Sequence, residues 1–214
     1  MAIELDMTGL INLAKLFYRI IDFRSRFTAT HSIGVAMTAK ALSKLIGFSE
    51  RECQMMEIAG YLHDLGKLEI PAEILEKPAK LTEDEFNIIK SHTYYTYSIL
   101  KTISDLDLIN DWPSFHHERL DGKGYPFHHK SRDLSIGSRI MAVADVFTAI
   151  SEERPYRKGM SSDKALQVLQ QMAQDSALDA HVVSTLAIHF NQANSIRITV
   201  QASASKEYHE FRKQ

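Results

Sequence analysis

Metal-ligand residues recur along this chain in clusters, with one cluster roughly every 24 to 32 residues, and each cluster lies in helix-like sequence. A helix and its connector take up about that much chain, so successive helices can each direct a ligand toward one shared point. The spacing therefore favours a helical bundle built around a common centre. The clusters supply five imidazoles and two carboxylates, from His31, His63, Asp64, His92, His116, His117 and Asp145.

The number of ligands indicates a two-metal centre. A closed structural site needs only four ligands and usually includes thiolates, whereas this set suffices for two metals with open positions. Adjacent His63 and Asp64 point about 100° apart on a helix, so His63 can bind one metal while Asp64 bridges to a second. We assign one metal to His31, His63, Asp64 and Asp145, and the other to Asp64, His92, His116 and His117.

The chemistry of these ligands points to hydrolysis. Mixed imidazole and carboxylate ligands suit iron, manganese or zinc better than magnesium or calcium. Two metals roughly 4 Å apart can activate water and polarise a phosphoryl oxygen for in-line attack at phosphorus. Lys67, one helical turn after His63, could neutralise the charge that develops on the phosphoryl group. A lone helical histidine is more often a core or surface residue than a metal ligand. The prediction of a hydrolytic metal centre therefore rests on the seven residues together.

Composition narrows the class of protein. The 214 residues can bury one sizeable core, and 44% hydrophobic and 24% charged residues are ordinary globular values. A net charge of -2 offers no basic face for duplex nucleic acid, and the longest apolar stretches are too short for membrane insertion. The start of the chain does not resemble a signal peptide. Cys53 is the only cysteine, which excludes an intrachain disulfide and fits a reducing cytoplasm.

Apolar residues at helical spacing predict an all-α fold, as in Leu10, Leu13 and Phe17. Ser49 to Glu52 and Thr82 to Glu85 have the capping-box pattern that begins a helix, the second leading to a helix that carries His92. Near the C-terminus, the alternating apolar residues Ile196, Ile198 and Val200 predict a short β-strand. We divide the chain into an N-terminal connector or dimer helix at 1–22, a catalytic domain at 23–192 and a C-terminal extension at 193–214.

Three stretches closely resemble the motifs of the HD-GYP domain, a branch of the HD phosphohydrolases. They are HDLGK at 63–67, HHERLDGKGYP at 116–126 and VADVFTAISEERPYR at 143–157. The resemblance covers about residues 20 to 189. It implies an HD-domain-like helical bundle with a binuclear metal centre, and a phosphodiesterase that hydrolyses the bacterial second messenger cyclic di-GMP to linear pGpG and sometimes to GMP. The family's metal ligands fall on the seven residues assigned above.

The same resemblance implies roles for four further residues. Lys67 matches the lysine that contacts substrate phosphate. Tyr125 belongs to the signature loop beside the substrate pocket, a loop thought to meet partner diguanylate cyclase domains, although this tyrosine could simply anchor the loop. Arg154 and Arg157 match basic positions that face the cyclic dinucleotide, but they could instead form surface salt bridges, which are weak.

Position 27 departs from the family pattern. Family members with three metals have a glutamate four residues before the first histidine, and here Phe27 occupies that position. A phenyl ring cannot bind a metal. We therefore expect two divalent metal ions, iron or manganese ahead of other transition metals, and pGpG as the main product.

Two other functions stay open at this point. The chain could be an HD phosphohydrolase of another nucleotide, although the intact GYP loop counts against this. It could also be a non-catalytic receptor or docking module for a cyclic dinucleotide or a cyclase, although the full ligand set and Lys67 count against that. The apolar face of the first helix, from Leu10 to Ile21, could pack on the domain or form a homodimer.

Overall fold

The computed structural model describes residues 5–24, 30–153 and 158–211, and within these ranges the fold is all-α, as the sequence predicts. The only β-type pairing among these residues is an isolated bridge between Asp121 and Lys130. The α-helices are α1 (Met7–Arg24), α2 (His31–Ile46), α3 (Glu50–Leu62), α4 (Ala72–Leu75), α5 (Glu83–Lys90), α6 (His92–Leu100), α7 (Asp111–Ser114), α8 (Ile136–Ser151), α9 (Ser162–Gln174), α10 (Ala180–Ile188) and α11 (Phe190–Phe211). The short 3-10 helices are η1 (Leu65–Glu69), η2 (Asp107–Ile109) and η3 (Ser131–Asp133).

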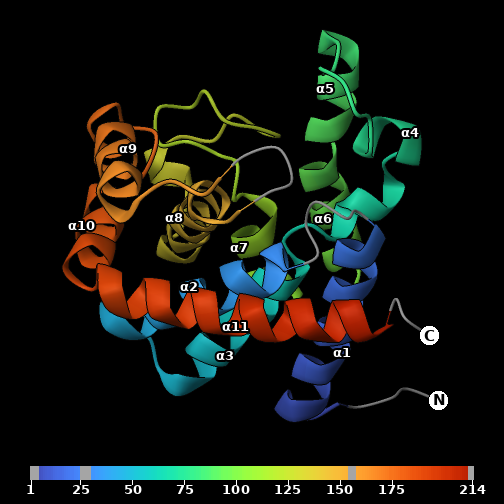
Figure 1. Ribbon diagram of the computed structural model, residues 1–214, viewed down its shortest axis with the longest axis horizontal. Coiled ribbons are helices and arrows are strands. Elements are labelled where there is room, and N and C mark those ends of the chain that lie inside the picture. The colour runs from blue at the N-terminus through green and yellow to red at the C-terminus, as the bar shows by residue number, and fades with distance from the viewer. Residues whose placement is uncertain (1–4, 25–29, 154–157, 212–214) are drawn as a thin grey trace.

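Helix α2 is the centre of the bundle. It packs against α3, α8 and α11, and Figure 1 shows α11 crossing in front of it while α5 projects from the body. Small residues allow the close approach of α2 and α3, because a Cβ added at Gly60 would overlap the backbone of Ala36. This contact brings the first residue of α2, His31, near the end of α3, which His63 caps.

The predicted helix starts are confirmed. Both capping boxes form, with Ser49 and Thr82 each accepting a hydrogen bond from the backbone three residues on. The helix predicted to carry His92 is, however, two helices. Helix α5 ends at Lys90, and α6 begins at His92, so the ligand stands at a helix start rather than inside a helix.

The predicted C-terminal strand is wrong. Its residues lie within α11, whose buried positions, Ala193, Arg197, Gln201 and Ala204, recur every three or four residues as on one face of a helix. Ile198 is exposed, so the apolar alternation that predicted a strand does not mark the buried face. Helix α11 also runs through the predicted boundary between residues 192 and 193, and the division into domains stays a prediction.

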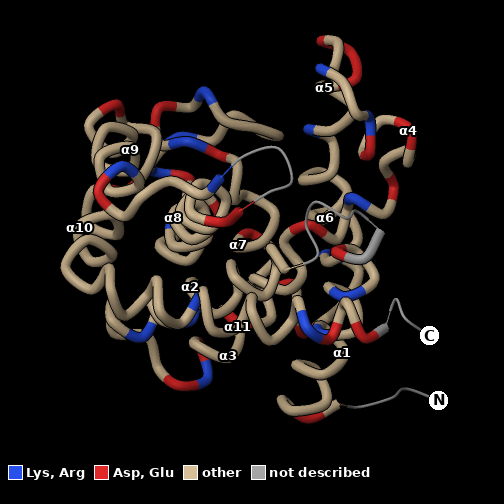
Figure 2. Tube along the Cα trace, viewed as in Figure 1, with Lys and Arg blue, Asp and Glu red and all other residues tan. Residues whose placement is uncertain are grey.

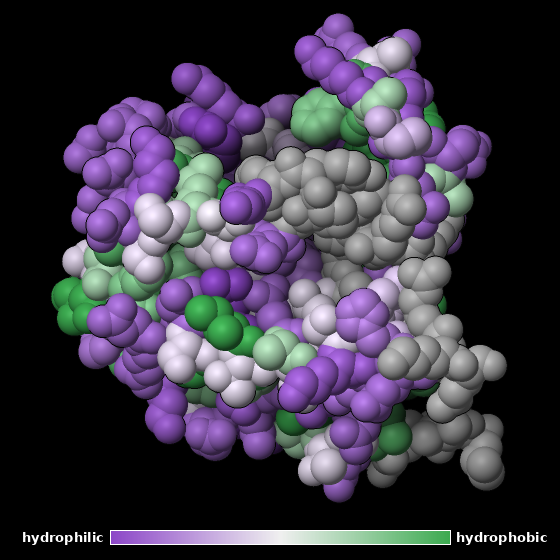
Figure 3. Space-filling model, viewed as in Figure 1, coloured by the Kyte–Doolittle hydropathy of each residue, from purple (hydrophilic) through white to green (hydrophobic). Residues whose placement is uncertain are grey.

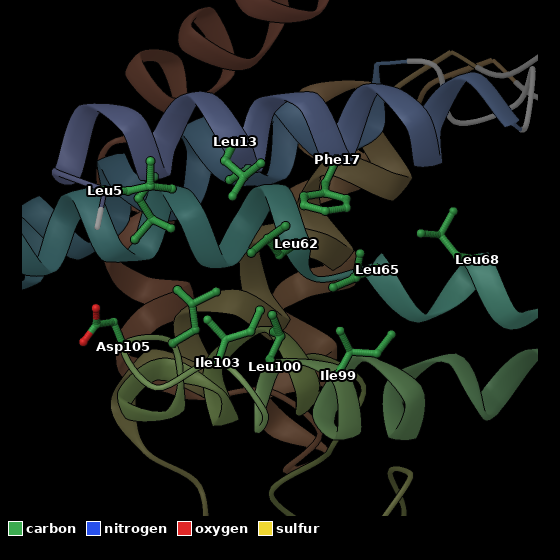
Figure 4. A pocket seen from close by; sticks show the side chains of 13 residues that line it. Leu5, Leu13, Phe17, Leu62, Leu65, Leu68, Ile99, Leu100, Ile103 and Asp105 are labelled. Carbon is green, nitrogen blue, oxygen red and sulfur yellow. The ribbon is translucent and has the colours of Figure 1, made fainter. Parts of the chain in front are cut away.

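Helix α1 packs on the domain through one face and exposes another. Ala14, Tyr18 and Ile21 join the core, whereas Leu16 and Ile20 are about half exposed. Between α1, η1 and α6 lies an apolar cavity of about 590 Å³. Figure 4 shows the α1 side chains that line it, including Leu13 and Phe17, opposite Leu62, Leu65, Ile99 and Ile103.

The surface carries both signs of charge. Acidic and basic residues interleave around α9 and in the segment between α4 and α5 in Figure 2, and the face in Figure 3 is mostly hydrophilic with separate hydrophobic areas. Among the described helices, none combines the length and the apolar character needed to cross a membrane.

Candidate metal centre

The seven ligand-type residues come from five places in the fold, and most of them stand at helix ends. His31 and His92 begin α2 and α6, and His63 caps α3. Asp64 precedes η1, His116 and His117 follow α7, and Asp145 alone lies inside a long helix, α8. The side chain of His117 is 31% exposed, and the other six residues are buried. Helices that end around one interior point therefore place their terminal side chains together.

The residues form two adjoining sets. The first ligand group is His31, His63 and Asp64, and the second ligand group is His92, His116 and His117. Within each group the potential ligand atoms all lie within 4.8 Å of one another. This is the distance scale of a single metal ion and its ligands, which sit at about 2.0 to 2.2 Å from the ion. Each group brings together residues that the sequence-based assignment gave to one metal, and the assignment of the metals stays a prediction.

Two carboxylates join the groups. Asp64 Oδ2 is 3.2 Å from His63 Nε2, and its Oδ1 is 3.3 Å from His92 Nε2, so its two oxygens face different groups. Asp145 behaves similarly, with Oδ1 at 3.0 Å from His31 Nε2 and Oδ2 at 3.7 Å from His117 Nδ1. The sequence-based assignment placed Asp145 with one metal only, and the structure adds its approach to the second group.

Backbone carbonyls orient three of the histidines. The Nδ1 atoms of His63, His92 and His116 lie 2.8, 2.7 and 2.6 Å from carbonyl oxygens three residues earlier in the chain. A carbonyl only accepts, so each Nδ1 carries the hydrogen and each Nε2 keeps a lone pair directed at the centre. Neutral imidazoles with carboxylates between them fit a divalent transition metal.

The electrostatics differ between the groups. Burial disfavours charge on His31, but Glu152 and Asp145 outweigh it and raise the pKa of His31 to about 10. In the second group burial prevails, lowering the pKa of His92 to about 3 and that of His116 well below its usual value. Despite its burial, Asp64 has a pKa well below the usual range because His63 and Lys67 stabilise its charge.

Lys67 and Tyr125 also reach the centre. Lys67 Nζ donates to Asp64 Oδ2 at 2.6 Å. The ring of Tyr125 lies 4.9 Å from that of His117, centroid to centroid, and burial raises the pKa of its hydroxyl. The three other positions singled out in the sequence, Phe27, Arg154 and Arg157, lie outside the described residues.

The signature loop packs directly on the His117 turn. Tyr125 N donates to the His117 carbonyl at 3.2 Å, and a Cβ at Gly124 would overlap the backbone of Glu118 and His117. The buried carboxylate of Glu118 accepts hydrogen bonds from the backbone amides of Phe127 and His129 at 2.7 and 3.1 Å. The loop is therefore held against the second ligand group.

Sequence reasoning missed Glu118 and Glu152. Glu118 directly follows the histidine pair, and its neighbours gave no sign that its carboxylate would turn toward the loop. Glu152 Oε2 lies 3.2 Å from His31 Nδ1. Glu152 lies just beyond the end of α8, as its C-cap in an extended conformation, and no local sequence pattern connects it to His31.

Comparisons with known proteins agree with this architecture. The profile of the HD domain family matches residues 15–182. The 3'3'-cGAMP-specific phosphodiesterase 1 of Vibrio cholerae is 33% identical over 195 residues, which cover 91% of this chain and 45% of that protein. The cyclic di-GMP phosphodiesterase response regulator RpfG of Xanthomonas campestris is 37% identical over 158 residues, which cover 71% of this chain and 40% of that protein.

A solved structure shares the fold. An HDG"Y"P protein from Bdellovibrio bacteriovorus has a TM-score of 0.62 at 12% identity, covering 87% of this chain and 65% of that one. The chain belongs to the HD domain family, in its HD-GYP branch. HD phosphohydrolases bind divalent metal ions, and the two ligand groups are the candidate sites here. The chain spans less than half the length of the two curated relatives described above.

Proposed function

We propose that this chain is a metal-dependent phosphodiesterase that hydrolyses cyclic di-GMP to linear pGpG. The observation that carries the proposal is the convergence of two ligand groups that share Asp64 between them. A single structural metal needs only one such group, whereas phosphodiester hydrolysis uses two metals side by side. The curated relatives named for cyclic di-GMP or cGAMP hydrolysis support the substrate class.

Two divalent ions, iron or manganese, are the cofactors in this proposal. His31, His63, Asp64 and Asp145 would hold one ion, and Asp64, His92, His116 and His117 the other. Bound there, the ions supply the charge that polarises a phosphoryl oxygen and activates water. The burial of the ligands excludes bulk water from the centre, which strengthens every electrostatic interaction inside it.

Other side chains would bind and orient the substrate. The Lys67 ammonium, beside Asp64, stands where it can balance charge developing on the phosphoryl group. The half-buried ring of Tyr125, next to His117, would contact the dinucleotide. Arg154 and Arg157 would complete the pocket through guanidinium contacts with phosphate, a geometry that suits two parallel hydrogen bonds.

A substrate panel tests the proposal. Protein purified without oxygen is analysed for metals and incubated with cyclic di-GMP, linear pGpG and bis(p-nitrophenyl) phosphate, with products separated by chromatography. We expect about two metals per chain and accumulation of pGpG. Tight binding of cyclic di-GMP by the metal-loaded protein without any turnover would replace the enzyme with the receptor alternative, and turnover of other nucleotides alone would replace the substrate.

A second candidate substrate is 3'3'-cGAMP, because the Vibrio cholerae relative that matches over most of this chain is named as specific for it. Both cyclic dinucleotides present the same phosphodiester chemistry and differ in one base. Parallel measurement of kcat/KM for the two substrates separates them. A preference for 3'3'-cGAMP would keep the metal chemistry and change the base that the pocket accepts.

We also propose that the protein acts in the cytoplasm and that residues 23–192 form its catalytic domain. The loop at 124–126 is the proposed contact with a diguanylate cyclase domain. The exposed residues Leu16 and Ile20 of α1 are the proposed contact in a homodimer, which sedimentation velocity over a range of protein concentrations would detect.

A further inference from the structure

His31 differs from the other buried histidines in what holds its outer ring nitrogen. His63, His92 and His116 each donate from Nδ1 to a backbone carbonyl three residues back, so their local turns fix them. The Nδ1 of His31 instead lies 3.2 Å from Glu152 Oε2, across a sequence separation of 121 residues. His31 is therefore oriented by the side chain of Glu152, which a single substitution can change, and not by a backbone carbonyl.

Glu152 fixes His31 from the side opposite the centre. Nε2 of His31 faces Asp145 Oδ1 at 3.0 Å, while Nδ1 faces Glu152. An ionised carboxylate only accepts, so Glu152 keeps the hydrogen of a neutral His31 on Nδ1 and leaves the Nε2 lone pair for a metal. Without this partner the ring could adopt the other tautomer, whose Nε2 hydrogen would point at Asp145 and block ligation.

Helix α11 holds Glu152 in turn. Gln201 Nε2 donates to Glu152 Oε2 at 3.0 Å and to the Thr30 carbonyl at 3.2 Å, just before His31. Arg197 donates to Gln201 Oε1 at 2.6 Å and to Asn194 Oδ1 at 2.8 Å. These bonds follow the turn spacing of one helix, and α11 lies across α2 in Figure 1.

The three side chains at the centre of this network are buried. Glu152, Arg197 and Gln201 are 6%, 6% and 9% exposed. The packing is also tight, because a Cβ added at Gly34 of α2 would lie 2.8 Å from Gln201 Nε2. A buried carboxylate is costly unless its partners compensate it, and this one is placed where only His31 of the ligand set can use it.

We propose that Glu152, held by Gln201 and Arg197, is a positioning residue that fixes the tautomer and orientation of His31 and thereby sets the metal affinity of the first ligand group. The proposal rests on the proposed function in one respect, that His31 binds a metal. Carboxylate partners of metal-bound histidines typically change metal affinity about 10- to 100-fold when removed. The alternative is that these residues only stabilise the packing of α11 on α2.

The test compares Glu152→Gln with Glu57→Gln. Glu57 is a matched control, because it is equally buried at 6% exposed and is paired with Lys40 at 2.7 Å, but it contacts no ligand residue. Mn²⁺ binding to metal-free protein is followed by titration with electron paramagnetic resonance detection. We expect Glu152→Gln to weaken one of two Mn²⁺ sites about tenfold or more and leave the other unchanged. Glu57→Gln should lower Tm without changing either site.

A double variant separates positioning from stability. Glu152→Gln combined with Gln201→Glu keeps one carboxylate and one amide in the cluster and places the carboxylate beside Arg197, so the moved carboxylate has a cationic partner. If the cluster only stabilises packing, this variant binds Mn²⁺ as the unchanged protein does, and the proposal is overturned. If Glu152 positions His31, weak binding at one site persists although the Tm recovers.

Nuclear magnetic resonance reads the tautomer directly in Zn²⁺-loaded protein labelled with ¹⁵N-histidine. The unchanged protein should show a hydrogen-bonded Nδ1 proton on His31, and Glu152→Gln should shift or lose it while the corresponding proton of His92 stays. An unaltered His31 signal in the variant would refute the proposal even if the variant were unstable. Failure of cyclic dinucleotide hydrolysis with two intact Mn²⁺ sites would instead refute the proposed function and leave this inference standing.

Discussion

The two ligand groups lie at one centre, but the pKa values of their buried histidines shift in opposite directions. Carboxylates surround the first group, so that His31 and His63 have raised pKa values despite their burial. The second group has three imidazoles and shares its carboxylates, and burial lowers the pKa of His92, His116 and His117. In the metal-free protein near neutral pH, His31 of the first group is therefore protonated, whereas His92 and His116 of the second group are neutral.

This difference predicts how each group takes up a metal. A metal entering the first group must displace a proton from His31, so its affinity should rise with pH. A metal entering the second group meets neutral imidazoles with lone pairs already directed by backbone carbonyls. Carboxylate charge therefore contributes most to the metal affinity of the first group, and lone pairs that are already oriented contribute most to that of the second.

Removal of Asp64 should break both groups at once. Its two oxygens face His63 and His92, so Asp64→Ala takes a ligand from each group and removes one acceptor of the Lys67 ammonium. We expect loss of both metals and of nearly all hydrolysis, with helical circular dichroism retained. Elemental analysis provides the measurement, and Asp84→Ala, an exposed carboxylate of α5, is the control. Retention of two metals would contradict the bridging role.

Two glycine substitutions should disturb the groups one at a time. A Cβ at Gly60 would overlap Ala36 and push α2, with His31, away from α3. A Cβ at Gly66 would overlap the His92 carbonyl and push α6 away from η1. Each alanine variant should lose about 1 to 3 kcal/mol of stability and weaken one metal site. Zn²⁺-loaded spectra should show a displaced His31 signal in Gly60→Ala and a displaced His92 signal in Gly66→Ala.

The control for these variants is Gly9→Ala. Its added Cβ would lie 3.2 Å from the side chain of Asp6, which can move, so both metal sites and the Tm should stay close to those of the unchanged protein. Equal disturbance of both groups by Gly60→Ala and by Gly66→Ala would mean that the two ligand groups respond as a single unit, which contradicts the prediction that each substitution affects one group.

Much of this arrangement could be predicted from sequence because its determinants are local. Capping boxes act within four residues, so Ser49 and Thr82 identified two helix starts correctly. Ligands that are adjacent in the sequence, such as His63 and Asp64, lie close together in any fold. Regular spacing then suffices to bring helix ends to one point, and for this reason the division into two groups was predictable.

Features that depend on distant partners could not be predicted. Glu152 reaches His31 across 121 residues, and Gln201 reaches Glu152 across 49, with no local pattern to connect them. The strand predicted near Ile198 failed for a related reason. The alternation of three apolar residues predicts a strand, whereas the buried face of α11 includes the polar residues Arg197 and Gln201, and Gln201 has its partners Thr30 and Glu152 far away in the chain.

The stability of the metal-free protein should depend on pH with opposite signs for the two groups. His92 has a pKa of about 3 when folded and about 6.5 when unfolded, so between these values the unfolded chain binds more protons and stability falls as pH falls. His31 has a folded pKa of about 10, so its contribution is complete below about 6.5 and is lost as pH rises toward 10.

Urea unfolding of metal-free protein across about pH 5 to 9.5 measures both slopes. His92→Gln should flatten the acid side and leave the alkaline side, and His31→Gln should do the reverse. If both substitutions changed the same side of the profile, the charge difference between the groups would be contradicted. Magnesium-free buffer with a chelator keeps the comparison to the side chains themselves.

The smallest expected effect concerns position 27, four residues before His31. Phe27 stands where the three-metal members that this chain resembles carry a glutamate, so Phe27→Glu would restore that carboxylate four residues before His31. We expect metal content to rise from about two toward three, and GMP to appear earlier, because extra cation charge can balance the terminal phosphate of pGpG. Phe27→Gln, similar in size but uncharged, is the control. Three metals in the unchanged protein, or rapid complete conversion to GMP, would show that Phe27 does not limit the centre, and a third metal would then need ligands beyond the two ligand groups and Asp145.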